Sequence, residues 1–103
     1  MKRMDRILSL LSLSAKGRNL VSGEFMAEKA IKEGTAKVVI VSEDASENTK
    51  KHFCDMCNYR KIPVFFYATK EELGKAIGRE MRASLAVTDA GMAANIIGHL
   101  EER

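Results

Sequence analysis

The segment Ser22–Lys51, SGEFMAEKAIKEGTAKVVIVSEDASENTKK, carries the pattern that decides the fold. It predicts a helix, a turn, a buried strand and a second helix. Gly23 opens the first helix and Gly34 closes it, because a positive φ costs little only for glycine. The run Val38-Val39-Ile40-Val41 is entirely β-branched, which is typical of a strand covered on both faces. Ser46 has a side chain suited to an N-cap and is expected to begin the second helix.

The alternation of helix and strand continues on both sides of this segment. The expected helices are Met4–Ala15, Glu24–Glu33, Glu47–Tyr59, a short helix from Thr69 that ends at Gly78, and a C-terminal helix capped by Asp89. The expected strands are Asn19–Ser22, Lys37–Ser42, a strand that Pro63 starts and that continues to Tyr67, and Ala83–Val87. Four strands alternating with five helices predict a three-layer α/β/α sandwich, in one domain over residues 1–103.

Charge is distributed unevenly along this chain, whose net charge is +3. Residues 1–37 hold eight Lys and Arg against four Asp and Glu, and residues 38–103 hold nine against ten. The basic excess of the N-terminal third suits an anionic partner, although a solvated helix face has the same composition. No apolar segment is long enough to span a membrane, and the two cysteines without a targeting segment predict a cytoplasmic protein.

Cys54 and Cys57 form a C-x-x-C pair inside the third expected helix. A redox pair is usually found at a helix start, where the dipole lowers the thiol pKa, so we expect these thiols to pack as small hydrophobic groups. Zinc requires further ligands, and His52 is poorly placed on the helix to share coordination with the pair. The sequence therefore predicts neither a metal site nor a cofactor.

Enzyme motifs are absent from the sequence. There is no G-x-S-x-G elbow, H-E-x-x-H, Walker loop or G-x-G-x-x-G. Asp44 follows a buried strand, as a phospho-acceptor aspartate does, but an acidic pair after the first strand is missing. We expect Asp44 instead to organise the turn into the next helix. The sequence predicts no catalytic residues and no enzyme activity.

The second expected helix has an exposed-looking basic face. Phe25, Lys29 and Lys32 share this face, opposite the apolar positions of the helix, and Met26 stands beside them. An aromatic residue next to lysines suits base stacking beside phosphates. The alternative is that Phe25 folds back onto a neighbouring element.

The chain resembles the ribosomal L7Ae/L30e family over about Arg18 to Ala94, through short motifs in a shared order. These motifs are Lys29-Ala30-Ile31, Gly34, Ala36-Lys37-Val38-Val39, Glu43-Asp44-Ala45, Cys57, Ile62-Pro63, Lys70, Glu72-Leu73-Gly74-Lys75-Ala76 and Gly78. The stretch Asp44–Lys51 looks most like the bacterial YlxQ-like branch. The resemblance implies an α/β/α sandwich with a four-stranded mixed sheet, which binds structured RNA, typically a kink-turn, without catalysis.

The resemblance also implies which residues contact RNA. Gly23 matches the family glycine before the binding helix, and Lys29 matches a phosphate-contacting lysine. Lys70 and the loop from Arg79 to Ser84 match further contact regions, and Ser46 with Lys50 matches a segment near a flipped-out nucleotide. The chain departs from the ribosomal members at Phe25-Met26, where they carry Asn-Glu, and neither side chain can accept a hydrogen bond from a guanine edge in the usual way.

Together, these arguments predict an RNA-binding protein. The expected RNA-binding residues are Gly23, Phe25, Met26, Lys29, Lys32, Ser46, Lys50, Lys70, Arg79 and Arg82. The expected partner is ribosomal or another structured RNA, with ribosomal or translation-associated proteins as further partners, and neither DNA nor a membrane is expected. The alternative is a protein-interaction module in which Phe25 and Met26 anchor a protein partner.

Overall fold

The computed structural model describes residues 5–102, and in them five helices alternate with four strands. In chain order these are α1 (Arg6–Lys16), β1 (Leu20–Ser22), α2 (Glu24–Glu33), β2 (Val38–Val41), α3 (Glu47–Arg60), β3 (Val64–Phe66), α4 (Lys70–Ala76), β4 (Ser84–Val87) and α5 (Ala90–Glu102). Each expected element is present: α2 has the expected bounds, and the ends of the other elements differ by at most two residues. The expected helix start at Met4 lies outside the described residues.

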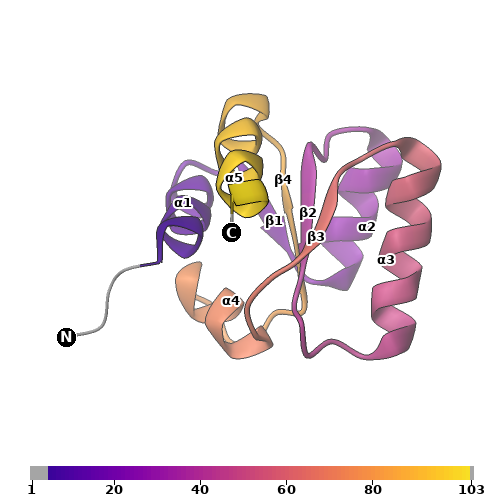
Figure 1. Cartoon of the computed structure of the whole chain (residues 1–103), viewed down its shortest axis with the longest axis horizontal. Coiled ribbons are helices and arrows are strands. Elements are labelled where there is room, and N and C mark those ends of the chain that lie inside the picture. The colour runs from indigo at the N-terminus through magenta and orange to yellow at the C-terminus, as the bar shows by residue number, and fades with distance from the viewer. Residues whose placement is uncertain (1–4, 103) are drawn as a thin grey trace.

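The four strands form one mixed sheet in the order β1-β4-β2-β3 (Figure 1). β2 and β3 are parallel, with Val39 opposite Val64, whereas β4 is antiparallel to both β1 and β2. The mixed sheet implied by the family resemblance is therefore confirmed. β1, β2 and β3 run in the same direction, so their carboxyl ends meet at one edge of the sheet, where α2, α3 and α4 begin.

Helices cover both faces of the sheet, which confirms the three-layer sandwich (Figure 1). Alternate residues of β2 point to opposite faces, as the period of a strand requires. Val38 and Ile40 join a core cluster with α1, α4 and α5, and Val39 and Val41 join a second cluster with α2 and α3. All four β2 residues are completely buried, and burial of each such side chain is worth roughly 1.5–3 kcal/mol.

Side chains cap four of the helices at their amino ends. Asp5, Ser46, Thr69 and Asp89 accept hydrogen bonds from backbone N–H groups three residues further along, at 2.9–3.1 Å. Thr69 and Glu72 form the expected capping box. The exception is α2, because its N-cap is Gly23, at φ 92°, and no side chain caps the helix.

No helix within residues 5–102 combines the length and the apolar character needed to cross a membrane.

Candidate functional site

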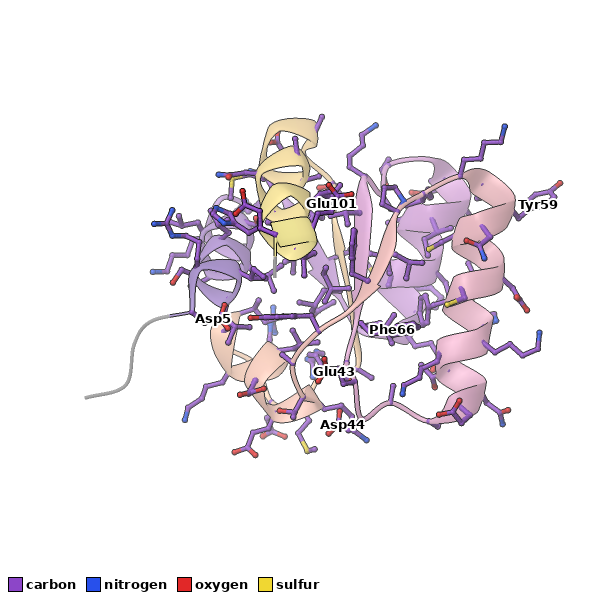
Figure 2. All side chains as sticks on the ribbon, in the orientation of Figure 1. Asp5, Glu43, Asp44, Tyr59, Phe66 and Glu101 are labelled. Atoms are coloured by element: carbon purple, nitrogen blue, oxygen red, sulfur yellow. The ribbon has the colours of Figure 1, made fainter. Side chains whose placement is uncertain are left out.

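Most of the predicted RNA-binding residues lie at the carboxyl ends of β1, β2 and β3. We call this region the carboxyl edge, and define it as the start of α2 with the loops 42–46, 67–69 and 79–83. Figure 2 shows Glu43 and Asp44 at this end of the molecule, with Tyr59 at the opposite end of α3. Ligands of open α/β sheets commonly bind at such an edge, because loops from several strands converge there.

Arg82 links the start of α2 to the start of α4. Its Nε donates to Ser22 Oγ at 3.2 Å, and its backbone N–H donates to the carbonyl oxygen of Lys70 at 3.0 Å. The Gly23 N–H donates to the carbonyl oxygen of Ser84 at 3.0 Å, which ties the turn before α2 to β4. These contacts place Gly23, Lys70 and Arg82, predicted from separate parts of the sequence, in one site.

Asp44 fixes the loop after β2 against α4. Its Oδ1 accepts from the Lys70 backbone N–H at 2.9 Å, and the Glu43 N–H donates to the Ala68 carbonyl oxygen at 2.8 Å. The pKa of Asp44 is lowered: desolvation acts to raise it, but hydrogen bonds to the carboxylate, first of all from the Lys70 backbone, together with the charge of Lys70 outweigh that effect. The sequence predicted that Asp44 would organise the turn into the next helix, α3. That prediction was wrong about the helix, because the carboxylate accepts from the backbone at the start of α4.

The amino end of α2 is open to a ligand. Gly23 has a positive φ, and a Cβ built at this position would meet nothing within 4 Å. The first N–H groups of a helix lack intrahelical partners and carry the positive end of the macrodipole, which favours an anion. Because Gly23 supplies no capping side chain, this helix start is available to a phosphate group.

Two large apolar side chains at the start of α2 face solvent. The side chain of Phe25 is 76% exposed and that of Met26 is 41% exposed. The alternative that Phe25 folds back onto a neighbouring element is therefore wrong. Met81, in the loop before β4, is 59% exposed; its loop was predicted as a contact region, but Met81 itself was not among the predicted site residues. Its signal in the sequence was an apolar residue between the charged residues of the loop 79–82.

Two predicted residues lie further along α2 and are engaged in exposed ion pairs. Lys29 Nζ lies 4.0 Å from Glu33 Oε2, and Lys32 Nζ lies 3.8 Å from Glu28 Oε1. Pairs of this kind contribute little to stability, so either lysine can exchange its partner for a phosphate. Lys32 is in the last turn of α2, about 12 Å along the axis from Glu24. The structure therefore does not bring Lys32 to the carboxyl edge.

Ser46 and Lys50 lie at the start of α3. The Ser46 hydroxyl caps this helix through the Thr49 N–H and also donates to Thr49 Oγ1 at 3.0 Å. Lys50 Nζ lies 3.7 Å from Glu47 Oε2 and 5.7 Å from the centre of the Phe66 ring. Arg79 lies on the exposed loop before β4, with its backbone N–H bonded to Gly74. Ser46 and Arg79 are exposed, whereas Lys50 is half-buried.

The C-x-x-C pair is not built as a reactive site. Both cysteines are free, and Cys57 is completely buried among the side chains that join α2 and α3 to the sheet. Burial raises the pKa of Cys57 to about 11, with a smaller contribution from Cys54. A thiol of this pKa is protonated at neutral pH, so it is a poor nucleophile and a poor metal ligand.

Comparison with known proteins identifies the family. Residues 5–97 match the model of the ribosomal protein L7Ae/L30e/S12e/Gadd45 family. The chain belongs to this family. The L7Ae/L30e assignment made from short motifs is thus confirmed. This membership and the named relatives agree with the expectation that the chain is a binding protein and not an enzyme.

Two relatives within the L7Ae family carry the same name. The RNA-binding protein YlxQ of Bacillus subtilis (strain 168) is 44% identical over 92 residues, covering 89% of this chain and 92% of the relative. The RNA-binding protein YlxQ of Enterococcus faecium is 33% identical over 89 residues, covering 86% and 85%. The predicted YlxQ-like branch agrees with both.

Solved structures share the fold of this L7Ae family member. A protein of unknown function from Bacillus halodurans C superimposes with a TM-score of 0.92 at 37% identity, covering 95% of this chain and 99% of that one. The 15.5kD RNA binding protein of Giardia lamblia superimposes with a TM-score of 0.80 at 22% identity, covering 97% and 92%. The second likeness concerns the fold alone.

Proposed function

We propose that the chain, residues 1–103, is one cytoplasmic domain that binds structured RNA at the carboxyl edge without catalysis. The observation that carries the proposal is the uncapped start of α2, with the 76% exposed side chain of Phe25 directly after it. Arg82, held between Ser22 and Lys70, places a guanidinium group beside the same helix start. A phosphate donor site, an aromatic surface and a cation are the elements that RNA recognition combines.

The family and the relatives support this proposal. Two relatives, at 44% and 33% identity, are named RNA-binding proteins. In the proposed complex Lys29, Lys70 and Arg79 neutralise further phosphates, since all three lie on elements of, or next to, the carboxyl edge. The RNA partner belongs to the ribosome or to another ribonucleoprotein.

The class of RNA follows from the side chains at the helix start. Phe25 and Met26 offer apolar surface, whereas reading sheared G·A pairs requires hydrogen-bonding groups at base edges. We propose that an unpaired base in a bent or looped RNA stacks on Phe25. A kink-turn is one such RNA, with an extruded nucleotide, and it is the first probe to use.

A pair of exposed aromatic residues provides the test. Phe25→Ala removes the proposed stacking surface, and Tyr59→Ala removes a side chain that is 82% exposed at the far end of α3 (Figure 2). Loss of one stacked base costs about 1–3 kcal/mol, so Phe25→Ala is expected to weaken binding by about 5- to 150-fold. The measurement is fluorescence anisotropy of a labelled kink-turn RNA and of a labelled hairpin loop at low salt. Equal affinity of both variants and the unchanged protein contradicts the stacking site.

The same apolar surface also fits a protein partner. Exposed aromatic and methionine side chains are frequent anchors at protein interfaces. In that case no RNA binds at low salt, and a partner retained from a lysate is lost with Phe25→Ala but kept with Tyr59→Ala. The RNA titration therefore discriminates between the two functions.

A further inference from the structure

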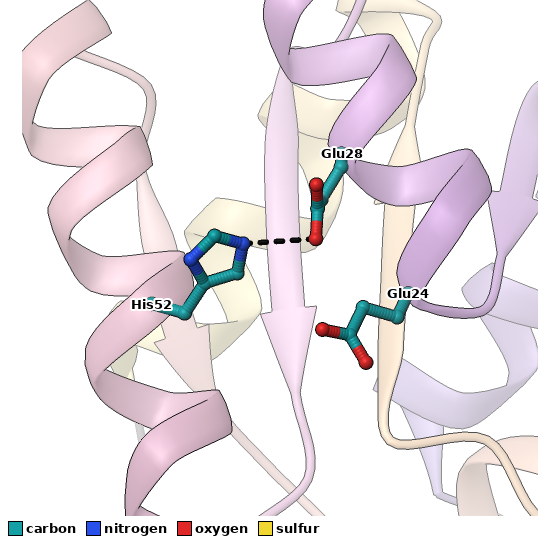
Figure 3. Close-up of side chains that lie close together, drawn as sticks. All are labelled: Glu24, Glu28 and His52. Atoms are coloured by element: carbon teal, nitrogen blue, oxygen red, sulfur yellow. Dashed lines mark hydrogen bonds and ion pairs between the residues drawn. The ribbon is translucent and has the colours of Figure 1, made fainter.

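Three side chains that can bind a metal ion converge between α2 and α3. Glu24 and Glu28 lie one turn apart on α2, and His52 reaches toward them from α3 (Figure 3). The Nε2 atom of His52 lies 2.8 Å from Glu28 Oε2. One ligand atom from each of the three side chains lies within 4.8 Å of the other two.

The charge of this cluster is incompletely balanced. Carboxylates at positions i and i+4 of a helix repel one another. Glu28 contacts both His52 and Lys32, at 2.8 Å and 3.8 Å. Glu24 makes no ion pair with any residue in the described part of the chain. A cation between the two helices would relieve the repulsion and give Glu24 a partner.

We propose that Glu24, Glu28 and His52 bind a zinc ion at the surface between α2 and α3. An imidazole nitrogen and carboxylate oxygens are zinc ligands, at about 2.0–2.2 Å from the metal. These bond lengths place neighbouring ligand atoms about 3.3 Å apart in a tetrahedral site. The three side chains therefore draw together slightly on binding, which their position at the surface permits. A fourth coordination position remains for water.

The donor set determines which ions bind. Mg²⁺ requires oxygen ligands in near-octahedral geometry, so it does not suit a site that contains an imidazole. Zn²⁺ binds more tightly than Mn²⁺ to mixed nitrogen and oxygen ligands. We therefore expect Zn²⁺ to bind more tightly than Mn²⁺, and Mg²⁺ not to bind. This proposal does not depend on RNA binding, although Glu24 borders Phe25 at the start of α2.

The sequence did not predict this site, and its expectation of no metal came from the cysteine pair. His52 is separated from Glu28 by a gap of 24 residues, and the two are brought together by the packing of α2 against α3. Neither cysteine belongs to this group of possible ligands in the described part of the chain, and Cys57 is buried in the core.

Isothermal titration of the reduced 103-residue protein with ZnCl₂ at about pH 7 tests the site. The expected result is one saturable site, and removal of a ligand by His52→Asn or Glu24→Gln weakens it by at least about tenfold. His99→Asn is the matched control. His99 Nδ1 lies 3.8 Å from Glu102 Oε1, but within residues 5–102 His99 belongs to no group of three possible metal ligands. Cys54→Ser controls for binding by the thiol, and both controls are expected to retain the affinity of the unchanged protein.

Nuclear magnetic resonance locates the ion. The ring resonances of His52 are expected to shift with Zn²⁺, while those of His99 stay in place. Absence of saturable binding, equal affinity of the His52→Asn protein, or loss of binding in Cys54→Ser overturns the proposal. Glu24→Gln and His52→Asn both change exposed side chains. If one of these variants fails to fold, the zinc affinity of the other still tests the site.

Discussion

At the scale of single residues, Cys57 is expected to make the free energy of unfolding decrease as the pH rises above about 9. Burial raises its pKa from 9.0 to about 11, so the folded state favours the neutral thiol. This contribution to stability is fully present below about pH 9 and is lost as the pH rises through about 11. A shift of this size corresponds to on the order of 3 kcal/mol.

Urea unfolding between these two pH values measures this contribution. The difference in free energy of unfolding between the unchanged protein and Cys57→Ala is expected to shrink as the pH rises. Cys54→Ala is the control, because Cys54 is only partly buried and the decline should persist in that variant. A difference that is constant over the whole range contradicts the assigned burial effect.

At the scale of elements, Gly74 lets α4 approach the loop that carries Arg79 and Arg82. A Cβ at this position would lie 1.6 Å from the Glu80 carbonyl oxygen and 2.5 Å from its carbonyl carbon. Gly74→Ala must therefore displace the loop or the helix, and we expect it to destabilise the protein by about 3 kcal/mol or more. Thermal unfolding of the variant measures the loss.

Gly98 provides the comparison for Gly74 within a helix. A Cβ at Gly98 would meet nothing within 4 Å, so Gly98→Ala is expected to stabilise α5 by up to about 1 kcal/mol. Equal stability of Gly74→Ala and the unchanged protein would show that the loop 79–82 adapts freely. In that case the loop does not hold Arg82 in a fixed place.

The elements themselves could be predicted because their signals are local. Thr69 with Glu72, and Asp89, cap helices through hydrogen bonds that span three residues, and such spacing is visible in the sequence. The partner of Asp44 could not be predicted in this way. Its carboxylate accepts from Lys70, 26 residues away, and only the meeting of strand ends at one edge defines that contact.

At the scale of the whole molecule, the directions of the strands determine which of the predicted site residues lie close together. Gly23, Lys70 and Arg82 meet because β1, β2 and β3 run in the same direction and β4 returns between them. Periodicity shows which face of α2 is exposed, so Phe25 and Lys29 were recognised from the sequence. It does not show how far Lys32 lies from Lys70 and Arg82, because that distance depends on which edge of the sheet α2 begins at.

Lysines at the two ends of the sheet are expected to contribute differently to RNA binding. Lys70 begins α4 at the carboxyl edge, and Lys37 precedes β2 at the opposite edge, with its backbone N–H bonded to the Val87 carbonyl oxygen at 2.7 Å. Each phosphate contact adds about 0.7–0.9 to the slope of log affinity against log salt concentration. Lys70→Gln is therefore expected to lower the slope for a kink-turn RNA by about 1, and Lys37→Gln to leave it unchanged. Both proteins lose the same formal charge, so an effect of net charge alone lowers the two slopes equally. That outcome would contradict a binding site confined to the carboxyl edge, whereas a change in Lys70→Gln alone places a phosphate contact there.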